Sequence, residues 1–240
     1  MRMDTVWARP TDFGAVVARG FAQFAALNDD ENTFLVDQAT NVQRFAARAE
    51  LVGEDAQGAT PLFLLSGWAC RARSLADGRR QILEFLLAGD LIPGGRALAA
   101  VCALTPVTVA PASKFCEEAF DPKGPFAHFV AVRHALERRR EMRLINQIVR
   151  AGRQTAYERV AHLLLEFYDR LSKVGLASDN SFAMPLTQEM LADGLGLSVV
   201  HVNRTLQQLR REHLLTITDG VVTLLEPAAL SRIADFRPML

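Results

Sequence analysis

The sequence predicts an α+β fold, in which a strand-rich first half is followed by a helical second half. Between residues 61 and 109, short apolar runs are broken by Gly, Pro and Asp, a texture typical of antiparallel strands joined by turns. After Pro125, apolar residues recur at spacings of three and four, which indicates amphipathic helices. The length of 240 residues allows one or two domains.

The strand-rich segment is expected to form a small antiparallel sandwich or barrel. Residues 62–65 are an apolar run, and the alternation over residues 68–73 predicts a half-buried strand. The dipeptide Asp77-Gly78 indicates a hairpin, because both residues tolerate the positive φ of a type I′ turn. Residues 81–87 would be the returning strand, and residues 107–109 would be one more short strand.

The helical pattern is strongest in the second half. A long helix is predicted from one apolar stripe, made by Phe129, Val132, Leu136, Met142, Ile145 and Val149. Gly152 marks a break or a kink, since glycine is a poor residue for a helix interior. A second helix should follow over residues 156–175, and then a polar linker over residues 177–182. Nearer the amino terminus, residues 13–27 also carry a helical pattern, and residues 42–52 are ambiguous.

Residues 185–206 have the spacing of a helix-turn-helix. Thr187 is a good N-cap for a short helix, and Ser198 for the helix after it. Ala192 provides the small side chain that two closely crossing helices need, and Gly196 can adopt the left-handed conformation of the turn between them. Val202 then points back into the shared core. The rest of the expected apolar seam is Leu191, Leu195, Leu197 and Leu206.

A compact hairpin is predicted directly after this motif. Residues 214–217 and 221–224 are short apolar runs joined by Thr218, Asp219 and Gly220, with an Asp-Gly turn. A hairpin in this position is the wing of a winged helix. The two caps and the wing together predict DNA binding, with the second helix in the major groove.

The second helix would present its early residues to base edges. Arg204 follows the inward Val202 by two positions and points outward, where arginine can form a bidentate contact to guanine, although a solvated surface arginine is the alternative. Asn203 could pair with adenine or a phosphate, and His201 and Gln207 could do either. Groups in the caps or first turns would meet phosphates, namely Thr187, Gln188 and Ser198.

Composition excludes several classes of protein. The chain has 27 basic and 27 acidic residues, which argues against a uniformly basic nucleic-acid coat. No apolar run approaches the roughly 20 residues of a membrane span, and residues 1–5 lack the apolar segment of a secretory signal. The three cysteines, an odd number without metal-ligand spacing, favour a reducing cytoplasm. No nucleophile–base pair, phosphate loop or metal cluster is visible, so an enzyme is not expected.

These motifs resemble those of the catabolite activator/fumarate-nitrate regulator (Crp–Fnr) family of bacterial transcription factors. The resemblance is most specific over residues 186–206 and the wing, and residues 156–164 look like the helix that leads into the family's DNA-binding domain. Farther upstream, the segments similar to the family's β-roll sensor are residues 65–68, 77–82 and 89–92.

The resemblance implies three parts. The first, over residues 1–125, would be a double-stranded β-helix, the cyclic-nucleotide-binding-like β-roll. A dimerisation helix over residues 126–152 and a winged helix-turn-helix DNA-binding domain over residues 153–240 would follow. The implied protein is a cytoplasmic homodimer that binds double-stranded DNA at a palindromic site, with RNA polymerase as a further partner.

The resemblance also implies a role for Arg204, because family members usually present the equivalent arginine to a guanine. Many members place a polar pair just after the serine, where this chain has Val199 and Val200. Val199 could instead touch a thymine methyl, so the half-site should differ from those of the best-known members.

The sensor departs further from the family pattern. Gly89, Asp90 and Leu91 keep part of the phosphate-binding turn of cyclic-nucleotide binders, but residues 93–98 do not reproduce the Arg-Ser/Thr-Ala segment. Cyclic AMP binding is therefore not expected. The first 69 residues contain no cysteine for an iron–sulfur cluster. No histidine precedes His128, so nothing in the sensor segment points to an axial haem ligand. We expect no cofactor. The alternative function is a ligand-sensing, cyclic-nucleotide-binding-like protein whose winged helix serves protein contacts.

Overall fold

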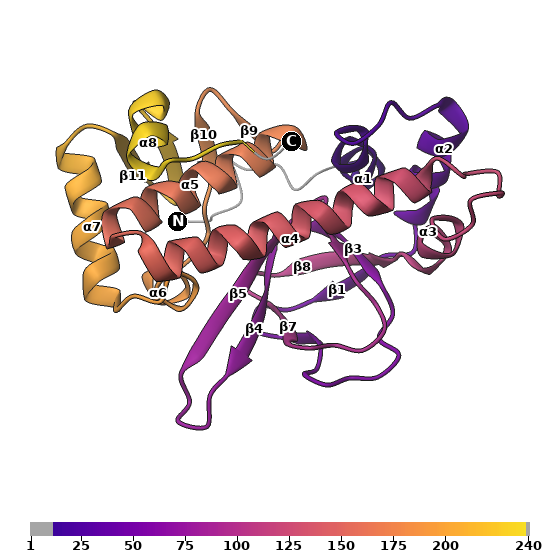
Figure 1. The fold of residues 1–240 in the computed structure, drawn as a ribbon, viewed down its shortest axis with the longest axis horizontal. Helices are drawn as coiled ribbons and strands as arrows, with labels where there is room; N and C mark the ends of the chain where they lie inside the picture. The colour runs from indigo at the N-terminus through magenta and orange to yellow at the C-terminus, as the bar shows by residue number, and fades with distance from the viewer. Residues whose placement is uncertain (1–11, 239–240) are drawn as a thin grey trace. The chain divides into compact units, whose positions relative to one another are not determined.

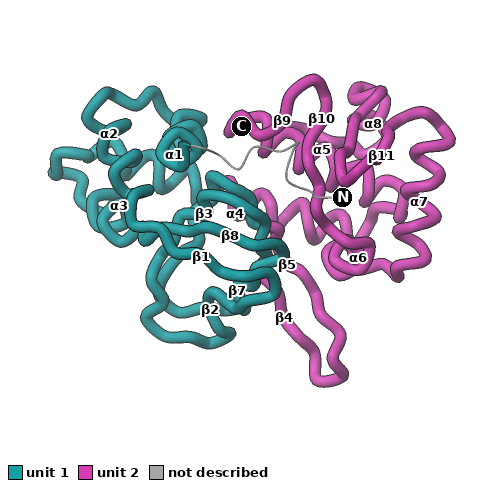
Figure 2. The backbone as a smooth tube through the Cα atoms, turned by 180° about the vertical axis from the view of Figure 1, so that it is seen from behind, with its two compact units in different colours: residues 1–70, 86–138 teal, residues 71–85, 139–240 magenta. Residues whose placement is uncertain are grey.

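The computed structural model describes residues 12–238, so residues 1–5, in which no secretory signal is expected, lie outside the described part (Figure 1). The chain divides into two compact units, coloured separately in Figure 2. Unit 1 holds residues 1–70 and 86–138, and unit 2 holds residues 71–85 and 139–240. Within the described range, no helix is both long and apolar enough to cross a membrane.

Antiparallel strands build most of unit 1, as the sequence predicted, and its described residues also form three short helices, of which only the first was expected. One sheet has the strand order β1-β8-β3-β6, and the other has the order β2-β7-β4-β5. The strands are β1 (Gln43–Phe45), β2 (Glu50–Val52), β3 (Leu62–Ser66), β4 (Trp68–Ser74), β5 (Arg80–Leu87), β6 (Leu91–Ile92), β7 (Ala100–Ala103) and β8 (Val107–Pro111). The helices are α1 (Phe13–Ala22), α2 (Asp29–Gln38) and α3 (Ser113–Glu118). Along the chain, β4 begins in unit 1 and ends in unit 2, whereas β5 begins in unit 2 and ends in unit 1.

A cluster of phenylalanines anchors the start of the long helix α4 (Phe129–Arg153) in unit 1. Phe21 of α1 meets Phe63 of β3 and Phe115 of α3 edge to face, with ring centroids 5.6 and 4.8 Å apart. Phe129 lies 5.3 Å from Phe115, and all four rings are buried. Aromatic pairs with this geometry stabilise a core beyond the area that they bury. The first turn of α4 is therefore fixed within its own chain.

Helices and one small sheet make up most of unit 2. After the second part of α4, the elements are α5 (Ala156–Lys173), β9 (Ala177–Ser178), β10 (Ser181–Ala183), α6 (Gln188–Leu195), α7 (Val199–Arg211), β11 (Leu215–Thr218), β12 (Val221–Leu224) and α8 (Pro227–Ala234). The sheet has the order β11-β12-β10-β9. Helix α5 begins with a capping box, in which the side chains of Thr155 and Glu158 each accept a backbone N–H of the other residue.

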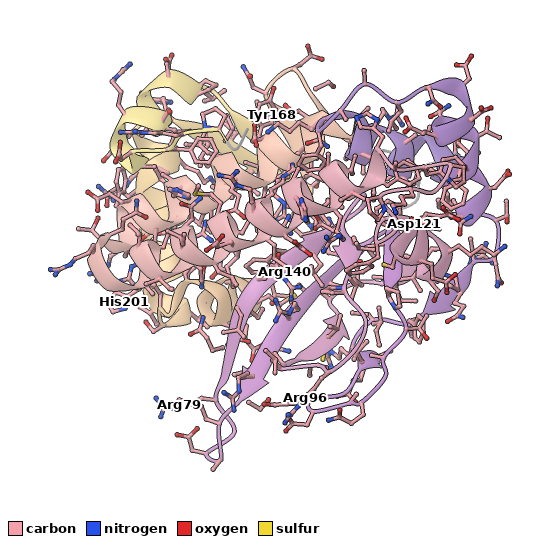
Figure 3. The ribbon with its side chains drawn as sticks, turned by 45° about the vertical axis from the view of Figure 1, so that its right-hand side comes forward. Arg79, Arg96, Asp121, Arg140, Tyr168 and His201 are labelled. Atoms are coloured by element: carbon pink, nitrogen blue, oxygen red, sulfur yellow. The ribbon has the colours of Figure 1, made fainter. Side chains whose placement is uncertain are left out.

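The hairpin of β4 and β5 forms, but its turn is not the predicted type I′. Gly78 has a positive φ of 85°, whereas Asp77 is not among the residues with positive φ. The Asp77 carboxylate instead accepts the backbone N–H of Arg79 at 3.0 Å, and Leu75 N–H donates to the Arg79 carbonyl at 2.7 Å. Residues 75–79 therefore form a loop longer than two residues, in which Gly78 is the residue with positive φ. Figure 3 labels Arg79 at this turn.

The structure differs from three further local expectations. Residues 177–182 are not a linker but the strands β9 and β10, joined by Asp179 and Asn180 with φ of 48° and 57°. The break predicted at Gly152 comes one residue later, because α4 ends at Arg153 and α5 begins at Ala156. The strand β4 is buried on both faces at its start, because Ala69 is buried as well as Trp68.

Candidate nucleic-acid interface

Two capped helices and a glycine turn build the helix-turn-helix where the sequence predicted it. The Thr187 hydroxyl accepts the backbone N–H of Met190 at 3.2 Å and begins α6. Gly196 ends α6 in the left-handed conformation, with φ 63° and ψ 39°. The Ser198 hydroxyl then accepts the backbone N–H of His201 at 3.3 Å and begins α7. Each cap satisfies a helix N–H that would otherwise lack a partner.

Helix α7 has one buried face and one exposed face. The buried face consists of Val202, Thr205, Leu206 and Leu209. It packs in a core that also contains Leu191 and Leu195, whereas Leu197, expected in this seam, is only half-buried. Because an α-helix turns about 100° per residue, the positions opposite the buried face are 200, 204, 207 and 211. All four side chains there are exposed, and we call Val200, Arg204, Gln207 and Arg211 the outward stripe.

The other candidate residues flank the outward stripe. Asn203 is half-buried, and its Nδ2 donates to Oε1 of Gln188 at 3.0 Å, which joins the two helices of the motif. His201 is exposed, with its Nδ1 2.9 Å from the Ser198 hydroxyl, and Figure 3 labels it at the start of α7. Val199 is exposed near Ser198, off the outward stripe. All the candidate residues predicted from the sequence thus lie in α6 or α7 or at the N-caps of these helices.

The sequence analysis missed Val200 and Arg211 as candidates. Both lie on the outward stripe with Arg204. The signal was present in the sequence, because a helical wheel drawn from Val202, Leu206 and Leu209 places both residues opposite the apolar seam.

The wing forms as predicted. Asp219 and Gly220 have φ of 51° and 77°, the two positive values that a type I′ turn needs. Strand β10, in the segment expected to be a linker, pairs with β12 and extends the wing to a larger sheet. The hydroxyls of Ser181 and Thr223 lie 2.9 Å apart across this pair.

Polar side chains hold α6 from its carboxyl end. Gln147 Nε2 donates to the Gly194 carbonyl at 2.5 Å, and Arg159 Nη1 donates to the Leu195 carbonyl at 3.1 Å. Arg80, from the β4–β5 hairpin, makes two bonds of 2.9 and 2.7 Å to one carboxylate oxygen of Asp193. The Gln147 and Arg159 bonds satisfy carbonyls at the end of the helix, and together with the Arg80 bonds they fix the orientation of α6 within unit 2.

One carboxylate near the end of α7 is engaged by its own neighbours. The hydroxyl of Tyr157 donates to Glu212, and Gln208 Nε2 donates to the same carboxylate at 2.9 Å. Burial and the Glu212 carboxylate together raise the pKa of Tyr157, while the Tyr157 hydrogen bond lowers the pKa of Glu212. Both groups therefore keep their usual charge at neutral pH.

The described residues contain no group of three or more His, Cys, Asp and Glu side chains that could hold a metal ion. The chemistry that the outward stripe offers is hydrogen bonding from guanidinium and amide groups, together with apolar contact from Val200. These are the groups that read base edges in a major groove.

Comparisons with known proteins agree with this geometry. Residues 158–233 match the Crp-like helix-turn-helix domain. The chain is 32% identical over 201 residues to the transcriptional activatory protein AadR of Rhodopseudomonas palustris, with 80% of each chain covered. It is 35% identical over 170 residues to the nitrogen fixation regulation protein FixK of Bradyrhizobium diazoefficiens, with 67% of this chain and 68% of the relative covered. The solved structure of FixK2 from Bradyrhizobium japonicum is similar with a TM-score of 0.70 and 27% identity, over 80% of this chain and 96% of that one.

Proposed function

We propose that this chain, which belongs to the Crp–Fnr family of DNA-binding transcriptional regulators, binds an inverted-repeat DNA site as a homodimer held together by α4. An exposed apolar stripe on α4 is the observation that carries this proposal. Met142, Ile145, Ile148 and Val149 are all exposed, and Ile148 is 70% exposed. At the other end of the same helix, Phe129 and Val132 are buried within their own chain.

The stripes of two copies of the chain can pack against each other. Its spacing of three and four residues is that of helices that pack side by side. Full burial of a Val, Leu, Ile or Met side chain is worth about 1.5–3 kcal/mol, so several partly exposed side chains on each helix make association of two copies favourable. The proposed interface is isologous, which means that the same surface of each chain forms both sides of a two-fold dimer.

A two-fold dimer would place its two recognition helices about one DNA turn apart, roughly 34 Å, on an inverted repeat. In each half-site Arg204 would make a bidentate contact to guanine. The other proposed contacts are made by Thr187, Gln188, Ser198, Val199, His201, Asn203 and Gln207. We divide the chain accordingly into a sensor-like part (1–125), a dimerisation helix (126–152) and a DNA-binding part (153–240). The role is regulatory and not enzymatic, in the cytoplasm, with RNA polymerase as a further partner.

The sensor part is proposed not to bind cyclic AMP. The Asp90 carboxylate accepts the backbone N–H of Leu87 at 2.8 Å, so it serves its own turn. Arg96 is 65% exposed in its side chain and lies 3.6 Å from the exposed Asp55, the position of a solvated loop arginine. A buried phosphate site needs a guanidinium and N–H groups that converge on the anion.

The dimer can be tested by placing a charge on the stripe. Ile148→Asp should make the protein monomeric in sedimentation velocity at micromolar concentration and should weaken binding to a palindromic duplex at least tenfold, because a carboxylate would be buried in the apolar contact between the two helices. Leu98→Asp is the matched control, since Leu98 is 69% exposed and lies in unit 1. An Ile148→Asp variant that remains dimeric would overturn the proposed interface. A dimer that binds no duplex would favour the alternative, in which the winged helix contacts protein.

A further inference from the structure

Val200 is an apolar side chain in an exposed position of the recognition helix. It is 70% exposed, on the second residue of α7 and at the beginning of the outward stripe. Exposing an apolar side chain to water to this extent brings no stability to the folded monomer. The face on which it lies is continuous with Arg204, the proposed guanine contact, and this continuity indicates what covers it.

The spacing of Val200 and Arg204 sets which base pairs they can reach. The two residues are four positions apart, so they are neighbours on one helix face and separated by about 6 Å along the axis. Base pairs stack about 3.4 Å apart. A helix that presents Arg204 to a guanine therefore brings Val200 to a base pair within about two positions of that guanine.

Only one base offers an apolar group in the major groove. This group is the C5-methyl of thymine, which can pack against an aliphatic side chain. Cytosine at the same place presents an amino group, which needs an acceptor, and the first turn of α7 contains no acidic residue. The amino group of cytosine would thus lose its hydrogen bond to water without gaining another, at a cost in free energy.

From these observations we propose that Val200 is a specificity-determining residue, which reads a thymine methyl close to the guanine that Arg204 contacts. The inference rests on the proposed function, because it requires α7 to lie in the major groove. Val199 is not equivalent, since it is 44% exposed and turned about 100° around the helix from Val200. Its predicted DNA contact would fall at a different position of the half-site.

The test begins with the duplex that the full-length protein selects from a random pool. Each thymine of that duplex is replaced singly by deoxyuridine, which removes the methyl and leaves the base pair intact, and the Kd is measured for each replacement. At one thymine of each half-site, within about two base pairs of the guanine, loss of the methyl should weaken binding about fourfold, as expected for one buried methyl group. The difference at this position should be much smaller in Val200→Ala, because alanine lacks the two γ-methyl groups of valine, whereas Val199→Ala should keep the fourfold difference there.

The possible outcomes distinguish failure of the proposed DNA-binding function from failure of the role of Val200 alone. Selection of no duplex would overturn the proposed function and this inference together. An enriched inverted repeat without a thymine in that place, or one for which the wild type binds uracil and thymine equally, would overturn the role of Val200 alone. A fourfold methyl effect that persists in Val200→Ala would do the same. The far-UV circular dichroism spectrum of Val200→Ala should match that of the wild type, which shows that the variant is folded.

Discussion

Replacing Glu166 with Gln tests a buried charge cluster in unit 2. The Glu166 carboxylate is buried on α5, where Arg150 Nη1 donates to it at 2.5 Å and Arg170 Nη1 at 3.2 Å. Both arginines are themselves buried. Arg170 also donates to the Phe85 carbonyl at 2.8 Å, and so holds the end of β5 in unit 2. Gln keeps the shape of Glu but removes the negative charge that the Arg150 and Arg170 guanidinium groups share.

The magnitude follows from the burial and the charges. Burial alone would raise the pKa of Glu166, but the Arg150 and Arg170 guanidinium groups lower it to about 2 from an ordinary value of 4.5. This difference corresponds to about 3 kcal/mol, present above pH 4.5 and lost as the pH falls toward 2. Breaking one partner of a buried ion pair costs about 3–5 kcal/mol in other proteins. Glu166→Gln should therefore lower the free energy of unfolding by about 3–4 kcal/mol near neutral pH.

His162 extends the same cluster and adds a second pH dependence. Its Nδ1 lies 3.1 Å from Arg150 Nη1, an arrangement in which the imidazole is the acceptor and is neutral. Burial, assisted by Arg150, lowers the pKa of His162 to about 4 from an ordinary 6.5. The stability that this neutral histidine contributes is present above pH 6.5 and is lost as the pH falls toward 4. Wild-type stability should therefore decline already in this window.

Urea unfolding followed by circular dichroism measures both effects. Glu189→Gln, on the exposed surface of α6, is the matched control and should stay within about 0.5 kcal/mol of the wild type. The reasoning is refuted if Glu166→Gln lies within about 1 kcal/mol of the wild type near neutral pH. It is also refuted if wild-type stability is constant from about pH 6.5 to pH 4.

Substitutions at three further residues test the DNA-binding part. Arg204→Ala should remove the preference at one guanine per half-site, by about 1–3 kcal/mol, and leave nonspecific binding nearly unchanged; an unaltered sequence preference in a binding selection would exclude the assignment. Gly194→Ala should destabilise the protein by about 1–3 kcal/mol in thermal unfolding, because the new Cβ would lie 2.5 Å from the Phe85 ring; a stability equal to the wild type would show that this contact is loose. Ser198→Ala should lower the free energy of unfolding by about 0.5–2 kcal/mol, because the His201 N–H loses its cap. Ser198→Asp should recover this stability, since aspartate is also a good N-cap.

The features that the sequence predicted well are those set by neighbours along the chain. The caps at Thr187 and Ser198, the left-handed Gly196 and the Asp219-Gly220 turn each depend on a few consecutive residues. The conformational preferences of these residue types are strong enough to decide local structure. Their positions in the sequence therefore predicted the helix-turn-helix and the wing.

Features that depend on distant residues could not be predicted in this way. Arg143 and Glu84 are 59 positions apart and form a buried pair at 2.8 Å, which no local pattern announces. The turn of β9 and β10 uses Asp179 and Asn180 without a glycine, so its strand-forming neighbours resembled a linker.

The apolar stripe of α4 shows the same limit in one element. Apolar residues recur at three- and four-residue spacings along the helix, yet Phe129 near its start is buried in its own chain and Ile148 near its end is exposed. Periodicity identifies an apolar face, but it does not say which surface covers that face.

Selection from random duplexes by the full-length protein tests the central claim most directly, provided that the number of chains on the selected duplex is measured as well. We predict an enriched inverted repeat whose half-site centres are about 10 base pairs apart, occupied by two chains. A single unrepeated half-site bound by one chain, or a pool with no enriched sequence, would contradict the proposal that two α7 helices read one DNA site across a dimer formed by α4.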